Sequence, residues 1–295
     1  MAQPDTPKSV LITGCSSGIG AASAHLMREK GWQVFPTARK PEDLARLKAE
    51  GFHPIEIDMA DSTSIQFAAR DVLAACGGKL GGVVNNAGFG QPGAMEDLSR
   101  EAMRRQFEVN VFGLQELNNL LVPVFRKQGA GRIVNVSSVV GRISLPFLGI
   151  YCASKFALEA MSDSLRVELV DSGIAVSLIE PGPIITQFRR NAVDQAEEQI
   201  SLEDAEYGKL MIKEIKRRRE RQKKEDFWNK PPEAVAVKIA HALESSKPKR
   251  RYCVTPAAYF GTYMRRFAPY SLTDYVLAKQ VRRKRQKIKE MTDAE

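Results

Sequence analysis

Short apolar runs alternate with longer amphipathic stretches along the first two thirds of this chain. The runs are rich in valine, isoleucine and leucine and are bounded by turn residues, which is typical of strands buried on both faces of a parallel sheet. They predict six strands, at residues 9–13, 32–37, 53–58, 82–86, 132–137 and 175–180. The stretches between them have helical periodicity, most clearly at about 19–30 and after Pro41. This alternation predicts an α/β fold with helices on both faces of the sheet.

The pattern changes after residue 186. Residues 187–230 are polar and highly charged with few strand signals, whereas 231–244 predict a helix and 251–255 a seventh strand. A chain of 295 residues with an apolar fraction of 43% fits one large α/β domain with additional elements at its C-terminal end. We therefore expect a single domain over 1–295, with its core in 8–186, a helix and the last strand in 231–256, and a basic amphipathic C-terminal extension in 257–295.

Composition argues against several classes of protein. No window approaches the roughly 20 uninterrupted apolar residues of a membrane-spanning helix, and the polar N-terminus lacks the apolar segment of a secretory signal. The cysteines and histidines are scattered, without the spacing of a disulfide framework or a metal site: Cys15, Cys76, Cys152, Cys253, His25, His53 and His241. We therefore expect a cytoplasmic protein with reduced thiols and no bound metal.

A glycine-rich loop between the first strand and the first helix is the first candidate for chemistry. Gly14 permits a tight turn, Gly18 lets the backbone approach a diphosphate, and Gly20 allows close packing of the helix. A diphosphate there would meet free N–H groups and the positive end of the helix dipole. A glycine turn alone is often purely structural, but as a dinucleotide site the loop would also use its intervening residues Ser16, Ser17 and Ile19.

The residues after the second strand bear on the choice of dinucleotide. An acid at this place binds a free ribose 2′-hydroxyl, whereas an arginine accommodates a 2′-phosphate. Here Arg39 and Lys40 follow the strand, and no acid occurs before Glu42. Arg39 therefore favours NADP(H), with NAD(H) as the alternative, unless the two cations are only a solvated pair that opens the next helix. Asp58, which closes the third strand, is a candidate for the adenine edge or, alternatively, an acid at a helix N-terminus.

Tyr151 and Lys155 are four residues apart in a helical stretch, which places them on one face, one turn apart. An ammonium beside a phenol favours the phenolate, so it lowers a tyrosine pKa that is about 10 when unperturbed. A tyrosine tuned in this way exchanges a proton with a hydroxyl or carbonyl near neutral pH. Combined with a dinucleotide loop, the pair predicts hydride-transfer chemistry.

Taken in order along the chain, these motifs resemble those of the short-chain dehydrogenase/reductase superfamily. The motifs are the glycine loop, Asn85-Asn86-Ala87-Gly88, Asn110, Ser138, Tyr151-x-x-x-Lys155 and Pro181-Gly182. The resemblance is close over 8–186 and is greatest to the branch of hydroxysteroid and retinol dehydrogenases and bacterial aldehyde reductases. It implies a Rossmann-type doubly wound sheet in the order 3-2-1-4-5-6-7, with the nicotinamide across its C-terminal edge and 187–230 as a helical substrate lid.

The resemblance also implies a role for each matching residue. The catalytic tetrad would be Asn110, Ser138, Tyr151 and Lys155: Tyr151 exchanges the proton, Ser138 polarises the carbonyl, Lys155 also binds the nicotinamide ribose, and Asn110 anchors a water that relays protons. Other positions would border the cofactor. These are Asn86, Ala87 and Gly88 near the adenosine ribose, and Pro181, Gly182, Ile184 and Thr186 near the nicotinamide.

The function expected from these residues is NAD(P)-dependent hydride transfer between an alcohol and its carbonyl partner. The family branch implies a bulky apolar ketone, steroid, retinoid or aldehyde. Two alternatives stay open: a nucleotide-sensing or scaffold protein that keeps the fold without turnover, and a sugar-nucleotide epimerase or dehydratase. Relatives usually pair through helices at about 100–128 and 151–172, so a homodimer is expected.

The formal charge of +9 is concentrated in two late segments, at 213–224 and 279–289. Neither has the interleaved aromatics of a nucleic-acid site, so no nucleic-acid partner is expected. In 257–295 an aromatic stripe at helical spacing precedes the second basic segment. Such a helix suits a peripheral contact with an anionic membrane, but an apolar stripe also packs on a sheet or on a partner subunit.

Overall fold

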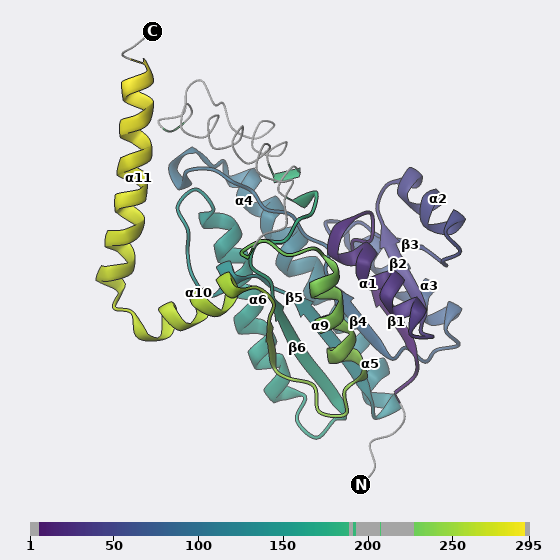
Figure 1. Ribbon diagram of the computed structural model, residues 1–295. Coiled ribbons are helices and arrows are strands. Elements are labelled where there is room, and N and C mark those ends of the chain that lie inside the picture. The colour runs from purple at the N-terminus through teal and green to yellow at the C-terminus, as the bar shows by residue number, and fades with distance from the viewer. Residues whose placement is uncertain (1–5, 189–190, 193–206, 208–226, 293–295) are drawn as a thin grey trace.

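A seven-stranded parallel sheet forms the centre of the molecule, in the order β3-β2-β1-β4-β5-β6-β7 that was expected (Figure 1). The computed structural model describes residues 6–188, 191–192, 207 and 227–292. The strands are β1 (Ser9–Ile12), β2 (Gln33–Ala38), β3 (Ile55–Glu56), β4 (Gly82–Asn85), β5 (Gly131–Val136), β6 (Ile174–Glu180) and β7 (Arg251–Cys253).

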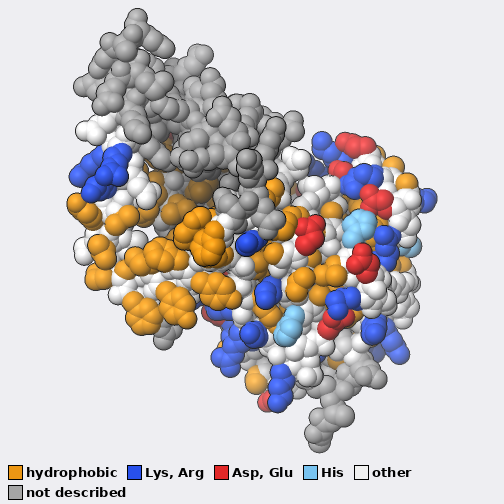
Figure 2. All heavy atoms as spheres, in the orientation of Figure 1, with side chains coloured by type: hydrophobic (Ala, Val, Ile, Leu, Met, Phe, Trp, Pro, Cys, Tyr) orange, Lys and Arg blue, Asp and Glu red, His pale blue; other side chains and the backbone are white. Residues whose placement is uncertain are grey.

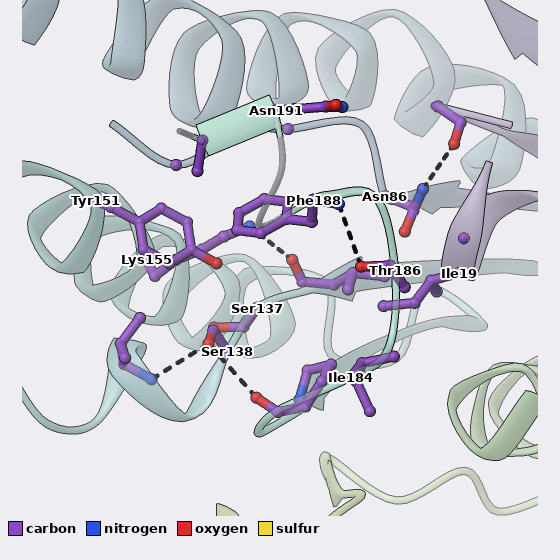
Figure 3. A pocket seen from close by; sticks show the side chains of 18 of the residues that line it. Ile19, Asn86, Ser137, Ser138, Tyr151, Lys155, Ile184, Thr186, Phe188 and Asn191 are labelled. Atoms are coloured by element: carbon purple, nitrogen blue, oxygen red, sulfur yellow. Dashed lines mark hydrogen bonds between the residues drawn. The ribbon is translucent and has the colours of Figure 1, made fainter. Parts of the chain in front are cut away.

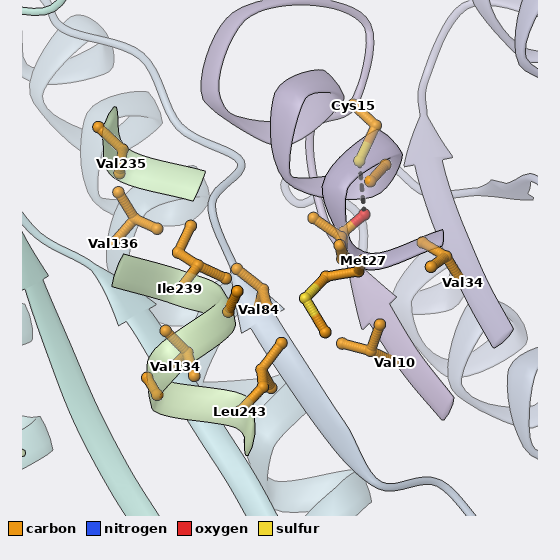
Figure 4. Packing of buried hydrophobic residues seen from close by; sticks show 14 of the residues in the cluster. Val10, Cys15, Met27, Val34, Val84, Val134, Val136, Val235, Ile239 and Leu243 are labelled. Atoms are coloured by element: carbon orange, nitrogen blue, oxygen red, sulfur yellow. Dashed lines mark hydrogen bonds between the residues drawn. The ribbon is translucent and has the colours of Figure 1, made fainter. Parts of the chain in front are cut away.

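Helices cover both faces of the sheet. On one face pack α1 (Gly18–Glu29), α2 (Pro41–Ala49) and α9 (Glu233–Glu244), and on the other α3 (Ser62–Ala75), α5 (Gly113–Gln128) and α6 (Gly149–Glu168). Figure 4 shows part of the first face, where α1 and α9 meet the central strands through Val10, Met27, Val84, Val134, Ile239 and Leu243. Because all strands are parallel, their carboxyl ends meet at one edge, where the loops that follow β1, β4, β5 and β6 come together.

The two edge strands are shorter than the predicted 53–58 and 251–255. An edge strand has a partner on one side only, so its ends are free to bond elsewhere. The amide N–H of Asp58 donates to the hydroxyl of Ser64 at 2.9 Å instead of extending β3. Thr255 ends β7 early because its hydroxyl accepts from the N–H of Ala258 at 3.3 Å and begins the next helix.

A π-helical turn interrupts the helical region near 100–128. It spans Glu108–Phe112 and joins α4 (Arg100–Phe107) to α5. Two 3-10 turns, Met95–Asp97 and Val139–Gly141 (η3), lie in the loops after β4 and β5. A π turn inserts one extra residue into a helix and is frequent at functional sites. Here it carries Asn110, which no periodicity argument would have set apart from the rest of the helix.

The C-terminal part projects from the body of the molecule. α10 (Pro256–Phe267) lies beside η3, and α11 (Tyr270–Thr292) extends away from the sheet (Figure 1). Among the helices of the described residues, none combines the length and apolarity needed to cross a membrane. Most of the lid expected at 187–230 falls outside the described residues.

Candidate active site

The glycine loop fits the cradle expected for a diphosphate. Gly14 and Gly18 have positive φ values of 73° and 60°, which favour glycine. A Cβ on Gly14 would lie 2.8 Å from the Cα of Ala87, and one on Gly20 would lie 2.2 Å from the carbonyl oxygen of Gly14. The loop, the start of α1 and the loop after β4 are therefore in backbone contact that any side chain would prevent.

The first turn of α1 is ready for an anion. Its N-cap, Ser17, makes no side-chain capping bond, whereas Asp61 caps α3 and Ser99 caps α4. The first N–H groups of α1 thus have no capping side chain, and such groups bind phosphate well. Arg46 of α2 steadies the loop by donating to the carbonyl of Ser16 at 2.8 Å. These features fit a bound diphosphate.

Thr13 and Asn86 fasten the ends of β1 and β4 to each other. The amide group of Asn86 donates to the carbonyls of Thr13 at 2.9 Å and Gly14 at 3.1 Å. The hydroxyl of Thr13 accepts from the N–H groups of Asn86 and Ala87, each at 2.9 Å. Sequence reasoning gave Thr13 no role. Its position directly before Gly14 was the available signal.

Replacing Gly14 by alanine should damage this loop far more than replacing Gly31, a glycine of similar φ. Gly31 has φ +78° and no atom within 4 Å of an added Cβ, so Gly31→Ala should lower the free energy of unfolding by only about 1 kcal/mol. Gly14→Ala adds a clash with backbone and should lower it by about 3 kcal/mol. Denaturant unfolding measures both, and a fluorescence titration with NADPH should show weaker binding for Gly14→Ala alone. Equal losses in the two variants would contradict the close contact.

One cavity of about 540 Å³ brings most of the predicted site residues together (Figure 3). The predicted residues in its wall are Gly14, Ser16, Ser17, Gly18, Ile19, Asn86, Ala87, Gly88, Ser138, Tyr151, Lys155, Pro181, Gly182, Ile184 and Thr186. Figure 3 shows Tyr151 and Ser138 on one side, with Ile19 and Asn86 across from them. The cavity therefore connects the glycine loop to the Tyr151–Lys155 face of α6. Gly20, Arg39, Asp58 and Asn110 are not in its wall.

The pKa of Tyr151 is not lowered, so that expectation from its spacing to Lys155 is wrong for this structure. The side chain is 9% exposed, and burial raises its pKa, while a hydrogen bond with Ser138 opposes the shift. Lys155 is not among the groups that shift the pKa of Tyr151, and its ammonium donates to the carbonyl of Val136 at 2.8 Å. A spacing of four places two side chains on one face, but it determines neither their burial nor their partners.

Lys155 is itself shifted by its surroundings. It is 5% exposed, and burial lowers the pKa of its ammonium to about 8, with the carboxylate of Glu159 opposing the shift. Lys155 is therefore mostly charged at neutral pH, and its charge lies on the cavity wall. A buried cation at this place is available to hydroxyl groups of a ligand.

Asn110 lies behind the cavity. Its amide group donates to the carbonyl of Phe89 at 2.9 Å and to the hydroxyl of Ser154 at 3.2 Å, and its oxygen accepts from the N–H of Phe89 at 3.1 Å. The side chain is fully buried. It therefore holds the loop after β4 against α6 and acts as a positioning residue, whereas the water that it was expected to anchor stays a prediction.

Arg39 and Asp58 form an ion pair at the edge of the sheet, with 3.6 Å between Nη1 and Oδ2. Their side chains are 56% and 35% exposed, so the pair is well solvated. Exposed pairs of this kind contribute little to stability. The guanidinium therefore remains available to a stronger anion.

An apolar wall beside Tyr151 was missed by the sequence reasoning. It consists of Val136, Val139, Val140, Leu145, Leu148, Phe188 and Ala192, with Ser137, Gly90 and Asn191 beside them. The ring of Phe188 lies 5.5 Å from that of Tyr151, centroid to centroid. A Cβ on Gly90 would lie 3.1 Å from the Phe188 ring. Most of these residues lie in loops or short turns after the strands, where no periodicity marks which side chains face a cavity.

The sequence model described as short chain dehydrogenase matches residues 8–197, which is more than half of the chain. The chain therefore belongs to the short-chain dehydrogenase/reductase family, as its motifs indicated. Together with the dinucleotide loop and the Tyr151–Lys155 wall, this makes it an NAD(P)-dependent oxidoreductase.

Three relatives match this chain over most of both sequences. The chain is 43% identical to the uncharacterized oxidoreductase YbbO of Escherichia coli strain K12, over 92% of this chain and 94% of YbbO. It is 35% identical to the NADPH-dependent 3-dehydrocapnine reductase of Ornithobacterium rhinotracheale, over 91% and 94% of the two chains. It is 34% identical to retinol dehydrogenase 16 of Mus musculus, over 87% and 86%. The branch expected from the motifs is thus represented among its relatives.

A solved structure agrees with the fold. A short chain dehydrogenase/reductase of Burkholderia phymatum, solved in complex with NAD, has a TM-score of 0.75 to this chain. The two chains are 25% identical, over 94% of this chain and 97% of the other. The likeness therefore extends over nearly the whole of both chains.

Proposed function

We propose that this enzyme prefers NADP(H) and interconverts the alcohol and carbonyl forms of a bulky apolar compound, with Tyr151 as the proton carrier. The observation that carries the proposal is the convergence of Ser138, Tyr151 and Lys155 on one cavity that also contains the glycine loop. A group held between them would meet a proton donor, a second hydroxyl and a buried cation. Non-catalytic nucleotide sensing would use Lys155 to bind the ribose, but it would not need a proton donor and a second hydroxyl at the same place.

The roles of the residues follow from their surroundings. When bound, the cofactor supplies or accepts the hydride. The first turn of α1 holds the diphosphate, and Lys155 binds ribose hydroxyls. Ser138 accepts from the N–H of Val140 at 3.3 Å and contacts the carbonyl of Pro181 at 3.4 Å, so its hydroxyl is held in place to orient a substrate oxygen. Tyr151 gives its proton to that oxygen during reduction and takes one during oxidation.

The raised pKa of Tyr151 supports reduction near neutral pH. Burial keeps the phenol protonated, and the protonated form is the one that reduction of a carbonyl requires. Oxidation of an alcohol requires the phenolate, so its rate should continue to rise as the pH is made more alkaline. Measuring the rates of carbonyl reduction and of alcohol oxidation as a function of pH tests this expectation. Oxidation that is fastest below neutral pH would contradict it.

The wall beside Tyr151 supports an apolar substrate. Leu145, Leu148 and Phe188 offer hydrocarbon surface and no hydrogen-bonding group next to the reactive hydroxyl. Burying apolar surface contributes roughly 25 cal/mol per Å², so this wall favours a large apolar group over a sugar. The names of two relatives, a 3-dehydrocapnine reductase and a retinol dehydrogenase, point to substrates of this kind.

The preference for NADP(H) is supported by Arg39. A 2′-phosphate carries more charge than the Asp58 carboxylate and accepts bidentate bonds, so it would draw the guanidinium out of its solvated pair. One relative is named as NADPH-dependent, whereas the Burkholderia phymatum structure contains NAD. Since relatives use both cofactors, the residue after β2 decides between them in each protein.

Replacing Arg39 by alanine should weaken the use of NADPH and leave NADH almost unchanged. The loss of one charge-assisted contact with the 2′-phosphate should lower kcat/KM for NADPH by roughly tenfold to a hundredfold. Lys48→Ala, which removes an exposed cation of α2, is the matched control. Steady-state kinetics measure the ratio of kcat/KM for NADPH to kcat/KM for NADH. An equal loss with both cofactors would mean that Arg39 does not determine cofactor specificity.

The proposed reaction is tested with a panel of substrates. Wild-type protein is incubated with NADPH and, separately, with long-chain ketones, retinal, steroid ketones and sugar nucleotides, while NADPH oxidation is followed by absorbance. We expect turnover with apolar carbonyl compounds. Conversion of a sugar nucleotide without net oxidation of cofactor would instead identify an epimerase and refute the proposal.

A further inference from the structure

The C-terminal helices expose a continuous aromatic and aliphatic surface. Eight large side chains on α10 and the first half of α11 are between 44% and 72% exposed: Tyr259, Phe260, Tyr263, Phe267, Tyr270, Leu272, Tyr275 and Val276. Among the described residues, they account for half of all exposed large hydrophobic side chains. Figure 2 shows hydrophobic side chains gathered in the region of α10 and α11, with lysine or arginine further along. We call these eight residues the aromatic face.

The other side of α10 is packed against the enzyme, so the orientation of the helix is fixed. Ala258 is fully buried, and a Cβ on Gly261 would lie 2.6 Å from the side chain of Val139 in η3. The N-cap bond from Thr255 ties the start of the helix to β7. The rings of Tyr263 and Phe267 stack on each other, with centroids 6.3 Å apart. The part of the aromatic face on α10 therefore points outward, because the opposite side of that helix is already occupied.

Positive charge continues along the same surface. Residues 279–289 contain seven lysines or arginines and no acid. Lys279 and Arg283 follow Leu272 and Val276 at a spacing of seven, so they lie on the same side of α11. The ammonium of Lys279 lies 5.9 Å from the centroid of the Tyr275 ring. The apolar and the cationic residues thus form one combined surface.

We propose that the aromatic face and the basic segment after it dock onto the surface of an anionic lipid bilayer. Tyrosine and phenylalanine rings insert at the level of lipid headgroups, and cations beside them are attracted to anionic lipid. The docked helices lie flat on the surface and do not cross it, in agreement with their charge. The sheet does not cover the aromatic face: the apolar stripe that was alternatively expected to pack on the sheet is exposed.

A second copy of the chain is a poorer occupant of this surface. In a symmetric dimer the same patch meets itself, so the seven cations of 279–289 would face a patch in which Asp274 is the one acidic residue between 259 and 289. An anionic surface instead complements the seven cations that α11 carries from Lys279 onward. The electrostatic argument therefore favours lipid over self-association.

Docking would also bring the cavity close to the lipid. α10 packs on Val139 of η3, and Val139 and its neighbours Ser138 and Val140 line the cavity. The wall that carries the reactive side chains is thus only one helix away from the proposed docking surface. This consequence rests on the proposed function, whereas the docking itself does not.

The test uses the full-length protein and sedimentation with vesicles. One set of vesicles is phosphatidylcholine alone, and the other contains phosphatidylserine as well. An aromatic-face variant replaces Phe260, Tyr263 and Phe267 by serine, and a charge variant replaces Lys279, Arg282 and Arg283 by glutamine. The matched controls change the same number of exposed residues outside both this surface and the helices expected to form a dimer: Phe67, Met95 and Val237 to serine, and Lys48, Lys79 and Lys247 to glutamine.

We expect the wild type to bind the phosphatidylserine vesicles at least tenfold more tightly than phosphatidylcholine vesicles. Both docking variants should lose at least tenfold in that affinity, and both controls should stay within twofold, with unchanged thermal unfolding in all cases. Binding that survives in the docking variants would overturn the proposal. If the wild type binds neither set of vesicles but forms a dimer, and the aromatic-face variant is monomeric, the surface is instead an interface with a second copy of the chain. Reduction of a soluble ketone is measured in parallel, so failure to dock is distinguished from failure of the proposed reaction.

Discussion

Replacing Tyr151 by phenylalanine should lower kcat by roughly 10²- to 10⁴-fold, because proton transfer by a positioned side chain contributes about that much to a rate. The change removes one oxygen and leaves the ring, which packs 5.5 Å from Phe188. Ser138 loses a partner but keeps its contacts with Pro181 and Val140. The fold and the affinity for cofactor should therefore change little. Steady-state turnover with NADPH and a fluorescence titration of cofactor binding separate the two effects.

Tyr259→Phe is the matched control, since Tyr259 is 51% exposed on α10 and lies outside the cavity. It should keep full turnover. A Tyr151→Phe variant with near wild-type kcat would reject the proton-carrier role. A wild type that binds NADPH tightly but reduces nothing, with Tyr151→Phe indistinguishable from it, would favour a nucleotide sensor.

The order of the sheet and the position of the site could be predicted from the sequence because both depend on local patterns. Apolar runs separated by helical stretches determine a parallel α/β sheet, and its strand order follows from the family that the motifs resemble. The positions after β1, β4, β5 and β6 then have to meet at one edge. Fifteen of the predicted site residues do line one cavity. The edge strands were predicted too long by more than any other, since their ends depend on competing bonds from Ser64 and Thr255.

The properties of the site that could not be predicted from the sequence depend on contacts between distant parts of the chain. The pKa of Tyr151 is set mainly by burial, and burial depends on how the loops after β5 and β6 close over the ring. The amide of Asn110 is used by the backbone of Phe89, which no motif indicates. Arg39 follows the second predicted strand and Asp58 closes the third, but their pairing depends on β2 and β3 being neighbours. Each of these properties arises from packing, which spacing along one helix does not reveal.

An ion cluster behind Lys155 is the clearest case of a feature without a sequence signal. Glu159 lies one helical turn beyond Lys155 on α6, and Glu180 ends β6; both are nearly fully buried. Arg251 of β7 contacts Glu159 and also Glu180, at 3.1 Å from its Oε1. Burial and the neighbouring Glu180 raise the pKa of Glu159, while Arg251 and Arg142 oppose the shift. Two buried carboxylates therefore depend on a guanidinium that lies 92 residues beyond Glu159 and 71 residues beyond Glu180 in the chain.

Replacing Arg251 by methionine should lower the free energy of unfolding by about 3 kcal/mol near neutral pH, since removing one partner leaves buried charge unpaired. The loss should depend on pH. A carboxyl whose pKa is raised by folding stabilises the protein while it is protonated and loses that contribution as the pH rises through the folded-state pKa. Without Arg251 the pKa of Glu159 should rise further, so the defect should be larger near about pH 8 than near about pH 5.

The matched control for this change is Arg250→Met, which removes the adjacent but exposed arginine. It should change stability by less than about 0.5 kcal/mol at either pH. Because Glu159 also acts on the ammonium of Lys155, Arg251→Met should in addition shift the pH profile of cofactor binding, which a purely structural defect would leave in place. Denaturant unfolding at the two pH values and an NADPH titration across pH measure both effects. Equal destabilisation by the two methionine variants, or a defect that is independent of pH, would mean that Arg251 does not neutralise the buried carboxylates.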